Sequence, residues 1–255
     1  MRKFTVVVPT CRTPDLIELL IRTFDKFAPA DVENHFIVVE NSPDDSYRDT
    51  VLSLSKNVTW IQNPEVPEFG TSNIPSAGSI ANGLGVLQGL EAVDDDYVFV
   101  AHCDVCVTSS SFFEEMFKGR EEGYWMVGTG IDNSRIKALH ISGFYIKTQL
   151  LHDVDIMPVF QDGDLVLDVG DTLTAYCRQN EIQMRCHENT FNNVARTADL
   201  DSPYREFHVD RCLDSGGNVM FMHLGRGVPK TKGKYSKPNR VYLPGWKEFI
   251  MRNVL

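Results

Sequence analysis

A cluster of reactive side chains ends the apolar stretch from Val98 to Val107: His102, Cys103, Asp104 and Cys106 lie within five residues. Cys103 and Cys106 have the C-x-x-C spacing of a redox pair. The same two cysteines and His102 are also ligands that a zinc site could use. A third chemistry needs only Asp104, whose carboxylate oxygens can bind a hard cation at the end of a strand.

The rest of the chain argues against the first two chemistries. A thioredoxin-like pair opens a helix near the start of a small domain, whereas about a hundred residues precede Cys103. A closed zinc site needs four ligands, and the remaining cysteines are scattered along the sequence. We therefore interpret Cys103 and Cys106 as small buried hydrophobic residues. Asp104 needs its own explanation, because burying an acid at a strand end is costly unless it is paired or bound to a metal.

The elements that must position these side chains alternate between strands and helices. Amphipathic periodicity predicts a helix over residues 13–28, with Thr13 as its N-cap and Pro14 at its first position. A second helix, rich in small residues, is predicted over residues 77–93. Such alternation implies an α/β fold with a parallel sheet covered by helices. Buried runs rich in β-branched residues predict strands over residues 3–10, 35–42, 58–63 and 96–105.

The second half of the chain predicts a more irregular, mixed structure. No repeat or low-complexity linker divides the sequence, so we predict a single domain over residues 1–255. The C-terminal stretch places Trp246, Phe249, Ile250 and Val254 on one helical face, which either packs on the domain or contacts a membrane or partner; packing is our prediction. Further helices are predicted over residues 110–119 and 171–180, and strands over 124–131, 138–151 and 220–227.

Ligands of open α/β sheets bind beyond the carboxyl ends of the strands. The predicted strands place polar or reactive residues there, so these residues should converge on one edge of the sheet. They are Thr10, Cys11, Arg12, Glu40, Asn41, Ser42, Asn63 and the segment from His102 to Cys106.

Composition narrows the class of protein. The 255 residues are 42% hydrophobic, which is enough for a full core, and no apolar run approaches the roughly 18 to 20 residues of a membrane span. The start of the chain does not resemble a signal peptide, so we expect a cytoplasmic protein with reduced cysteines. A formal net charge of −10 argues against nucleic acid as a partner. Only the segment 225–240 is basic, with six Lys and Arg residues and no acid, and it could meet an anionic ligand.

The front of the chain resembles the GT-A fold glycosyltransferases of family 2. The stretches "FTVVVPTCRTPDLIELLIRTF", "IVVENSPDD", "SAGSIANGLGVLQGL" and "DYVFVAHCDVCV" follow one another as in that family, over about residues 4–115. The resemblance implies a Rossmann-like fold of the nucleotide-diphospho-sugar transferase type, with a mixed central sheet flanked by helices. It divides the domain into a nucleotide-binding half, 1–115, and an acceptor-binding half, 116–255, that ends in a basic lid.

The resemblance also implies a function. Such enzymes move a sugar from a nucleoside diphosphate sugar, here most simply a UDP-sugar, to a hydroxyl of a glycan or lipid-linked acceptor, as in polysaccharide biosynthesis. Mn²⁺ or Mg²⁺ neutralises the diphosphate, with Asp104 and His223 as the implied ligands. The family usually has a second acid where this chain has His102, which would then face the sugar or ribose; if both acids are needed, metal dependence is in question. The implied donor-binding residues are Pro9, Thr10, Arg12, Glu40, Asn63, Ser79, Asn82, His102, Arg226 and Lys230, and His140 is the acceptor-side candidate.

An inverting transfer also needs a general base, and Asp168 and Asp171 precede a helix where similar enzymes place one. Asp171 is the first choice, although it could serve only as a helix N-cap. The small residues around Ser79 and Asn82 likewise allow either close approach of a nucleotide or helix packing. Three other functions stay open: a retaining transferase, a nucleotide-sugar binding domain without activity, and a nucleotidyltransferase, whose usual glycine-rich segment after the first strand is absent here.

Overall fold

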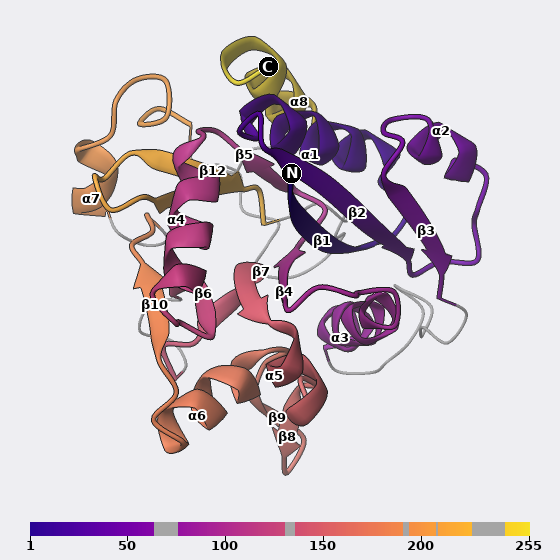
Figure 1. Cartoon of the computed structure of the whole chain (residues 1–255), viewed down its shortest axis with the longest axis vertical. Coiled ribbons are helices and arrows are strands. Elements are labelled where there is room, and N and C mark those ends of the chain that lie inside the picture. Colours follow the sequence, from indigo (N-terminus) through magenta and orange to yellow (C-terminus); the bar gives the residue numbers. More distant parts are fainter. Residues whose placement is uncertain (64–75, 131–135, 191–193, 208, 226–242) are drawn as a thin grey trace.

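A seven-stranded mixed sheet runs through the molecule (Figure 1) in the order β10-β6-β7-β4-β1-β2-β3. The computed structural model describes residues 1–63, 76–130, 136–190, 194–207, 209–225 and 243–255. Neighbouring strands are parallel except at β7, which is antiparallel to both β4 and β6. The strands are β1 (Arg2–Thr10), β2 (Val32–Glu40), β3 (Val58–Gln62), β4 (Tyr97–Ala101), β6 (Met126–Gly130), β7 (Leu139–Lys147) and β10 (Met184–His187).

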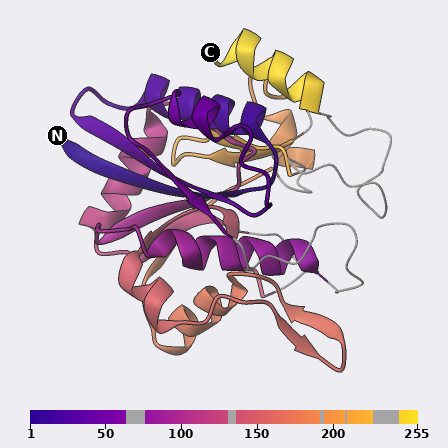
Figure 2. The ribbon, with the colours of Figure 1, turned by 90° about the vertical axis from the view of Figure 1, so that its right-hand side faces the viewer.

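The central strands are apolar along their length because both faces of the sheet are covered. Val6 and Val8 of β1 point into one core cluster and Val7 points into the other, as the period of two requires. On the first face lie α1 (Pro14–Phe27), α4 (Ser111–Glu121) and α8 (Leu243–Asn253), and on the second lie α3 (Ala77–Leu90), α5 (Thr148–Asp153) and α6 (Asp171–Gln179). Figure 2 shows α1 and α8 on one side of the sheet and α3 on the other.

A second, three-stranded sheet in the order β11-β12-β5 lies beside the central one. It consists of β5 (Val105–Val107), β11 (Asp210–Leu213) and β12 (Val219–His223). The prediction of one strand over residues 96–105 is therefore wrong, because β4 ends at Ala101 and β5 pairs with β12 instead. The backbone turns between them, where the Val105 amide donates to the His102 carbonyl over 3.2 Å. Asp104 thus lies in a turn between two sheets.

Several predicted boundaries shift. The strand predicted over residues 138–151 ends at Lys147 and is followed by α5. Thr13 occupies the N-cap position of α1 without a capping hydrogen bond, since its hydroxyl contacts Thr10 Oγ1 at 2.6 Å. The short helices α2 (Arg48–Leu52) and α7 (Val194–Ala198) complete the described helices.

A hairpin that we did not predict projects from the second half, formed by β8 (Val159–Gln161) and β9 (Asp164–Leu167). Its turn residues Asp162 and Gly163 have φ of 52° and 86°. Two positive φ angles at an Asp-Gly pair are typical of a type I′ hairpin turn, so the dipeptide carried the signal.

The C-terminal helix packs on the domain, as predicted. Trp246 and Ile250 are fully buried, and the ring of Phe249 stacks on that of Phe207 with centroids 4.0 Å apart. The apolar face of α8 is therefore part of the first core cluster. None of the described helices has the length and hydrophobicity needed to cross a bilayer.

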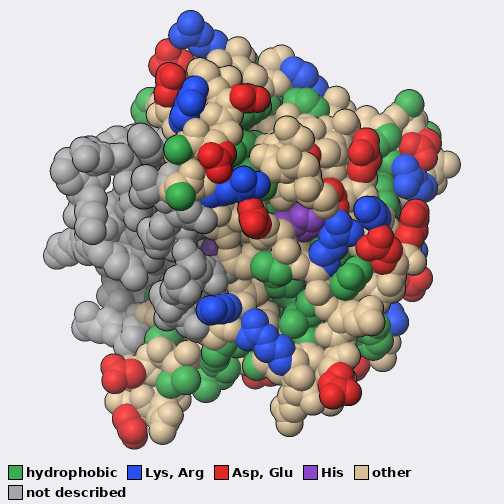
Figure 3. All heavy atoms as spheres, turned by 90° about the vertical axis from the view of Figure 1, so that its left-hand side faces the viewer, with side chains coloured by type: hydrophobic (Ala, Val, Ile, Leu, Met, Phe, Trp, Pro, Cys, Tyr) green, Lys and Arg blue, Asp and Glu red, His purple; other side chains and the backbone are tan. Residues whose placement is uncertain are grey.

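Ion pairs connect β10 to α4 and to the residue that caps it. Figure 3 shows acidic and basic side chains next to one another on the face that it presents. Arg185 lies 2.9 Å from Glu115 and 3.1 Å from Glu122. His187 lies 3.8 Å from the same Glu115 carboxylate, and burial is the main cause of its lowered pKa. These ion pairs fix β10, the edge strand of the sheet, to α4 on the first face.

Candidate metal centre

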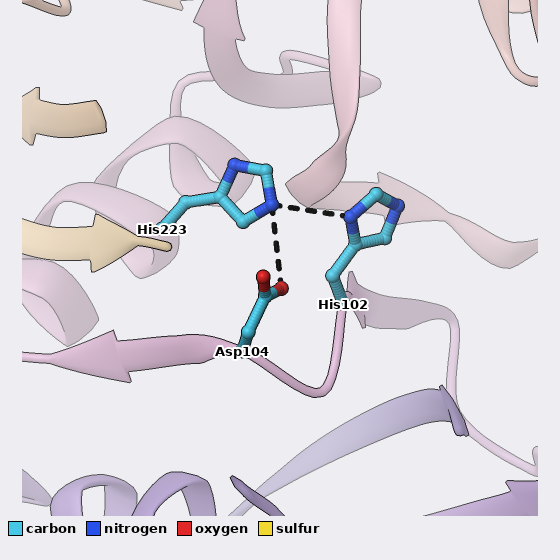
Figure 4. Close-up of side chains that lie close together, drawn as sticks. All are labelled: His102, Asp104 and His223. Carbon is cyan, nitrogen blue, oxygen red and sulfur yellow. Dashed lines mark hydrogen bonds and ion pairs between the residues drawn. The ribbon is translucent and has the colours of Figure 1, made fainter. Parts of the chain in front are cut away.

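Three side chains from distant parts of the sequence meet at the carboxyl edge of the central sheet (Figure 4). His223 Nε2 lies 3.3 Å from Asp104 Oδ1 and 3.2 Å from His102 Nδ1. One ligand atom from each of the three residues lies within 4.8 Å of the others, as a shared metal ion requires. Asp104 and His223 are 3% and 6% exposed, so little water screens their charges and the low local dielectric strengthens charge interactions.

Strand pairing explains why these residues meet. β12 runs antiparallel to β5, and His223 at the end of β12 is opposite Val105 at the start of β5. The next amide, that of Leu224, donates to the Asp104 carbonyl over 3.1 Å. His102 directly follows β4, so the turn that joins the two sheets places it beside Asp104.

A second carboxylate lies behind His223. Asp210, the first residue of β11, is directly opposite His223 in the strand register, and its Oδ2 lies 3.3 Å from His223 Nδ1. Burial disfavours the imidazolium, but the charge and hydrogen bond of Asp104 and those of Asp210 outweigh it and raise the pKa of His223 to about 10. The imidazole therefore has one nitrogen facing Asp104 and the other held by Asp210.

His102 is also held on its far side. Its Nε2 lies 2.5 Å from Asn82 Nδ2 on α3. His140 adds a third ring, with its centroid 5.7 Å from those of both His102 and His223. It comes from the amino end of β7, which reaches this edge because β7 is antiparallel to β4. The predicted acceptor-side residue thus borders the metal-ligand group.

The predicted donor-binding residues at the ends of β1 and β2 lie together. The Arg12 amide donates to both Glu40 oxygens, at 3.3 and 3.2 Å, while Arg12 itself has a φ of 54°. Glu40 is fully buried, which raises its pKa to about 7 despite hydrogen bonds that favour the carboxylate. Thr10 and the preceding Pro9 are buried as well. Glu40 therefore supports the β1–α1 turn, which keeps the Arg12 side chain exposed.

A chain of amides links the end of β3 to α3. Asn63 Nδ2 donates to Asn41 Oδ1, and Asn41 Nδ2 donates to the Ala81 carbonyl, each over 2.9 Å. Glycines allow α3 to approach this closely: a Cβ on Gly85 would come within 2.9 Å of both Pro9 and Asn41. Packing thus accounts for Gly83, Gly85 and Gly89 of α3, while Ser79 and Asn82 on its first turns are partly exposed.

The two candidate bases lie at the start of α6. The N-cap of this helix is Gly170, so Asp171 is its first helical residue and is not the N-cap. Asp171 is buried, and its Oδ2 accepts a hydrogen bond from the Asp168 amide over 2.9 Å. A Cβ on Gly170 would lie 3.3 Å from the Ile141 side chain, so this turn lies beside the amino end of β7.

The cysteines of the opening motif are packed in the core, as predicted. Cys103 and Cys106 are free, are 5% and 1% exposed, and belong to the first core cluster. Burial, helped by the nearby Asp104 charge, raises the pKa of Cys103 to about 12, and burial also raises the pKa of Cys106. Neither thiol has the lowered pKa of a reactive cysteine.

Arg226 and Lys230 of the basic segment lie outside the described residues. Asp210 was missed: the sequence "DSGGN" between two apolar runs signals the hairpin turn, but it does not show the bulge that places Asp210 opposite His223.

Solved structures show what this fold resembles. No protein-family model matches the chain, and no curated protein is similar to it in sequence. A mannosyltransferase from Pyrobaculum calidifontis, solved with GDP-Man and Mn²⁺, superposes with a TM-score of 0.51 and 16% identity. The match covers 72% of this chain but 54% of that one, so the chain spans about half the length of the mannosyltransferase. Glucosyl-3-phosphoglycerate synthase from Mycobacterium tuberculosis, solved with Mn²⁺, UDP and glucosyl-3-phosphoglycerate, gives a TM-score of 0.49 with 16% identity. That match covers 73% of this chain and 70% of the other.

The match to the mannosyltransferase establishes the class of fold. The mixed sheet with one antiparallel strand, helices on both faces and a polar carboxyl edge is the GT-A fold of glycosyltransferases. The predicted fold class is thereby confirmed.

Proposed function

We propose that this chain is a metal-dependent glycosyltransferase of the family 2 type, which transfers a sugar from a nucleoside diphosphate sugar to an acceptor hydroxyl. A UDP-sugar is the proposed donor and a glycan or lipid-linked hydroxyl the proposed acceptor, in the cytoplasm. One observation supports this best. Asp104 and His223 are far apart in sequence, but their side chains lie 3.3 Å apart at the carboxyl edge of the central sheet of a GT-A fold.

The residues at this edge fit a divalent cation. Asp104 offers an anionic oxygen and His223 an imidazole nitrogen, and both are buried, as ligands that must exclude competing water are. A divalent cation held by these two residues would neutralise the charge that develops on a diphosphate leaving group. The side chains on the same edge, including Arg12 and Asn82, are the proposed contacts to the rest of the donor. We also propose that the basic segment with Arg226 and Lys230 contacts the diphosphate.

Asp171 and Asp168 are the proposed sources of the general base. Their turn borders Ile141 at the amino end of β7, in the half of the chain assigned to the acceptor. A carboxylate there removes the proton of the attacking hydroxyl on the face opposite the leaving group, which inverts the anomeric carbon.

Transfer from labelled nucleotide sugars tests the proposal. Purified protein is incubated with Mn²⁺ and UDP-, GDP-, CDP-, ADP- or dTDP-linked sugars, with a panel of simple glycosides as acceptors, and the products are resolved by NMR. We expect a product of inverted anomeric configuration with one donor base and none with Asp104→Ala. A retained anomer would instead assign a retaining mechanism, and nucleotide binding without turnover would favour a binding domain.

A further inference from the structure

We propose that the cation site of this chain is a two-imidazole, one-carboxylate site, with His102 as the third ligand, that selects transition metals over Mg²⁺. The expected order of affinity is Zn²⁺ and Co²⁺ above Mn²⁺, and Mn²⁺ well above Mg²⁺. This inference deepens the proposed function and rests on it for the role of the bound ion. It also reassigns His102, which the resemblance placed against the sugar or ribose.

The spacing of His223 Nε2 from the other two ligand atoms fits one ion, and all three ligand atoms lie within 4.8 Å of one another. Ligands with bonds of about 2.1 Å are about 3.0 Å apart in an octahedral site and about 3.4 Å apart in a tetrahedral one. His223 Nε2 lies 3.2 Å from His102 Nδ1 and 3.3 Å from Asp104 Oδ1, between these two values. The two rings are not stacked, since their planes make an angle of 65°, and these two nitrogens face one another (Figure 4).

Each imidazole also has an outer partner that directs a lone pair into the site. Metal-bound histidines commonly donate their second ring N–H to a carboxylate or another oxygen, which fixes the tautomer. For His223 that partner is Asp210, 3.3 Å from Nδ1, so Nε2 faces the site.

For His102 the outer partner is Asn82, 2.5 Å from Nε2. The amide oxygen of Asn82 is buried without a hydrogen-bond partner among the described residues, whereas its nitrogen is the atom next to His102. A 180° rotation of the amide, which exchanges two atoms of nearly equal size, places the oxygen on the His102 Nε2–H. This arrangement satisfies the oxygen and leaves the Nδ1 lone pair directed at His223 and Asp104.

Ligand type then sets the selectivity. Mg²⁺ prefers oxygen ligands and gives up its water reluctantly, whereas imidazole suits zinc and the later transition metals. An acid at position 102 would supply a second oxygen, and His102 supplies a nitrogen in its place. The chain's own residue at this position thus moves the site away from Mg²⁺.

Metal titrations of the whole chain test the inference. After removal of metal with a chelator, Mg²⁺, Mn²⁺, Co²⁺ and Zn²⁺ are titrated separately by calorimetry. We expect Mn²⁺ to bind at least about tenfold more tightly than Mg²⁺, and His102→Asp to narrow that ratio by about tenfold. Pulsed EPR of bound Mn²⁺ should show nitrogen couplings from two imidazoles in the wild type and from one in His102→Asp or His102→Ala.

His140→Ala is the matched control, since this ring lies in the same cluster but outside the ligand group. It should keep both nitrogen couplings and the Mn²⁺ affinity. Equal affinities for Mg²⁺ and Mn²⁺, or unchanged nitrogen couplings in both His102 variants, would overturn the inference.

The two proposals fail separately. Binding of a nucleoside diphosphate that Mg²⁺ and Mn²⁺ support equally would contradict the selectivity and leave the proposed function in place. Selective binding of Mn²⁺ with two imidazole couplings, but no binding or turnover of any nucleotide sugar, would support the site and contradict the proposed function.

Discussion

His223 joins two carboxylates that come from different strands. Its Nδ1 lies 3.3 Å from Asp210 Oδ2, and its Nε2 lies 3.3 Å from Asp104 Oδ1. Asp104 faces the candidate metal centre, whereas Asp210 fixes the orientation of the ring from behind. The two acids therefore have different tasks, and their substitutions should have different effects.

Asp210→Ala should weaken Mn²⁺ binding without abolishing it. Loss of a carboxylate behind a metal-bound histidine typically reduces metal affinity about 10- to 100-fold, because the ring tautomer and orientation are no longer fixed. The measurement is the Kd for Mn²⁺ by calorimetry, compared with that of Asp104→Ala, for which we expect no measurable binding.

Asp214→Ala is the control for Asp210. Asp214 lies at the opposite end of the same strand pair, where it accepts hydrogen bonds from the Gly216 and Asn218 amides, each at 2.9 Å. This variant should lower the free energy of unfolding and keep the wild-type Kd for Mn²⁺. Equal Kd values for Asp210→Ala and the wild type would show that Asp210 does not position His223.

Asp171→Asn and Asp168→Asn separate chemistry from binding. If either carboxylate is the general base, its amide variant should lose at least about a hundredfold in the rate of transfer while nucleotide affinity stays the same. The rate is measured with the nucleotide sugar that the transfer assay selects as donor, and the affinity by calorimetry. Full activity in both variants would contradict the inverting assignment.

Glu40 should make the protein less stable as the pH rises. Burial raises its pKa from 4.5 to about 7 in the folded state, so between these values the folded chain holds a proton that the unfolded chain has released. Stability is therefore lost as the pH increases through this window, by about 2 to 3 kcal/mol. Glu40→Gln, which has no charge to bury, should lack this loss.

Urea unfolding at pH 5 and pH 8 measures the effect of Glu40. The free energy of unfolding of Glu40→Gln, relative to the wild type, should increase by about 2 kcal/mol from pH 5 to pH 8. A difference that does not change with pH would show that Glu40 is ionised throughout.

The alternation of strands and helices in the first hundred residues could be predicted because apolar periodicity determines it. The break after Ala101 could not. The residues on both sides of it are buried, so the apolar run continues through two strands of different sheets. No glycine or proline marks the turn at His102, and only the pairing of β5 with the distant β12 shows where β4 ends.

The approach of His223 to Asp104 was predicted from a resemblance, whereas the place of Asp210 depends on a detail of strand register. The pairing of β11 with β12 shifts by one residue at a bulge between Cys212 and Leu213. Without that shift the residue opposite His223 would be Val209, and Asp210 would point to the other face. A bulge of this kind is set by local packing and has no clear sequence signature.

The thiols of the C-x-x-C motif should be inert in the folded protein. Cys186 is exposed, whereas Cys103 and Cys106 are buried and have raised pKa values. A disulfide-exchange reagent should therefore modify Cys186 first and the motif only after denaturation. Peptide mapping by mass spectrometry identifies the order, and early modification of Cys103 in native protein would reopen the redox interpretation.

Asp104 is proposed to help bind a cation that holds a nucleoside diphosphate. The most direct test is a thermal-shift screen of the wild type and Asp104→Ala against UDP, GDP, CDP, ADP and dTDP, each with and without Mn²⁺. We predict that one nucleotide raises the melting temperature of the wild type only when Mn²⁺ is present, and that Asp104→Ala shows no such rise. A shift that is independent of the metal, or that persists in Asp104→Ala, would contradict this account.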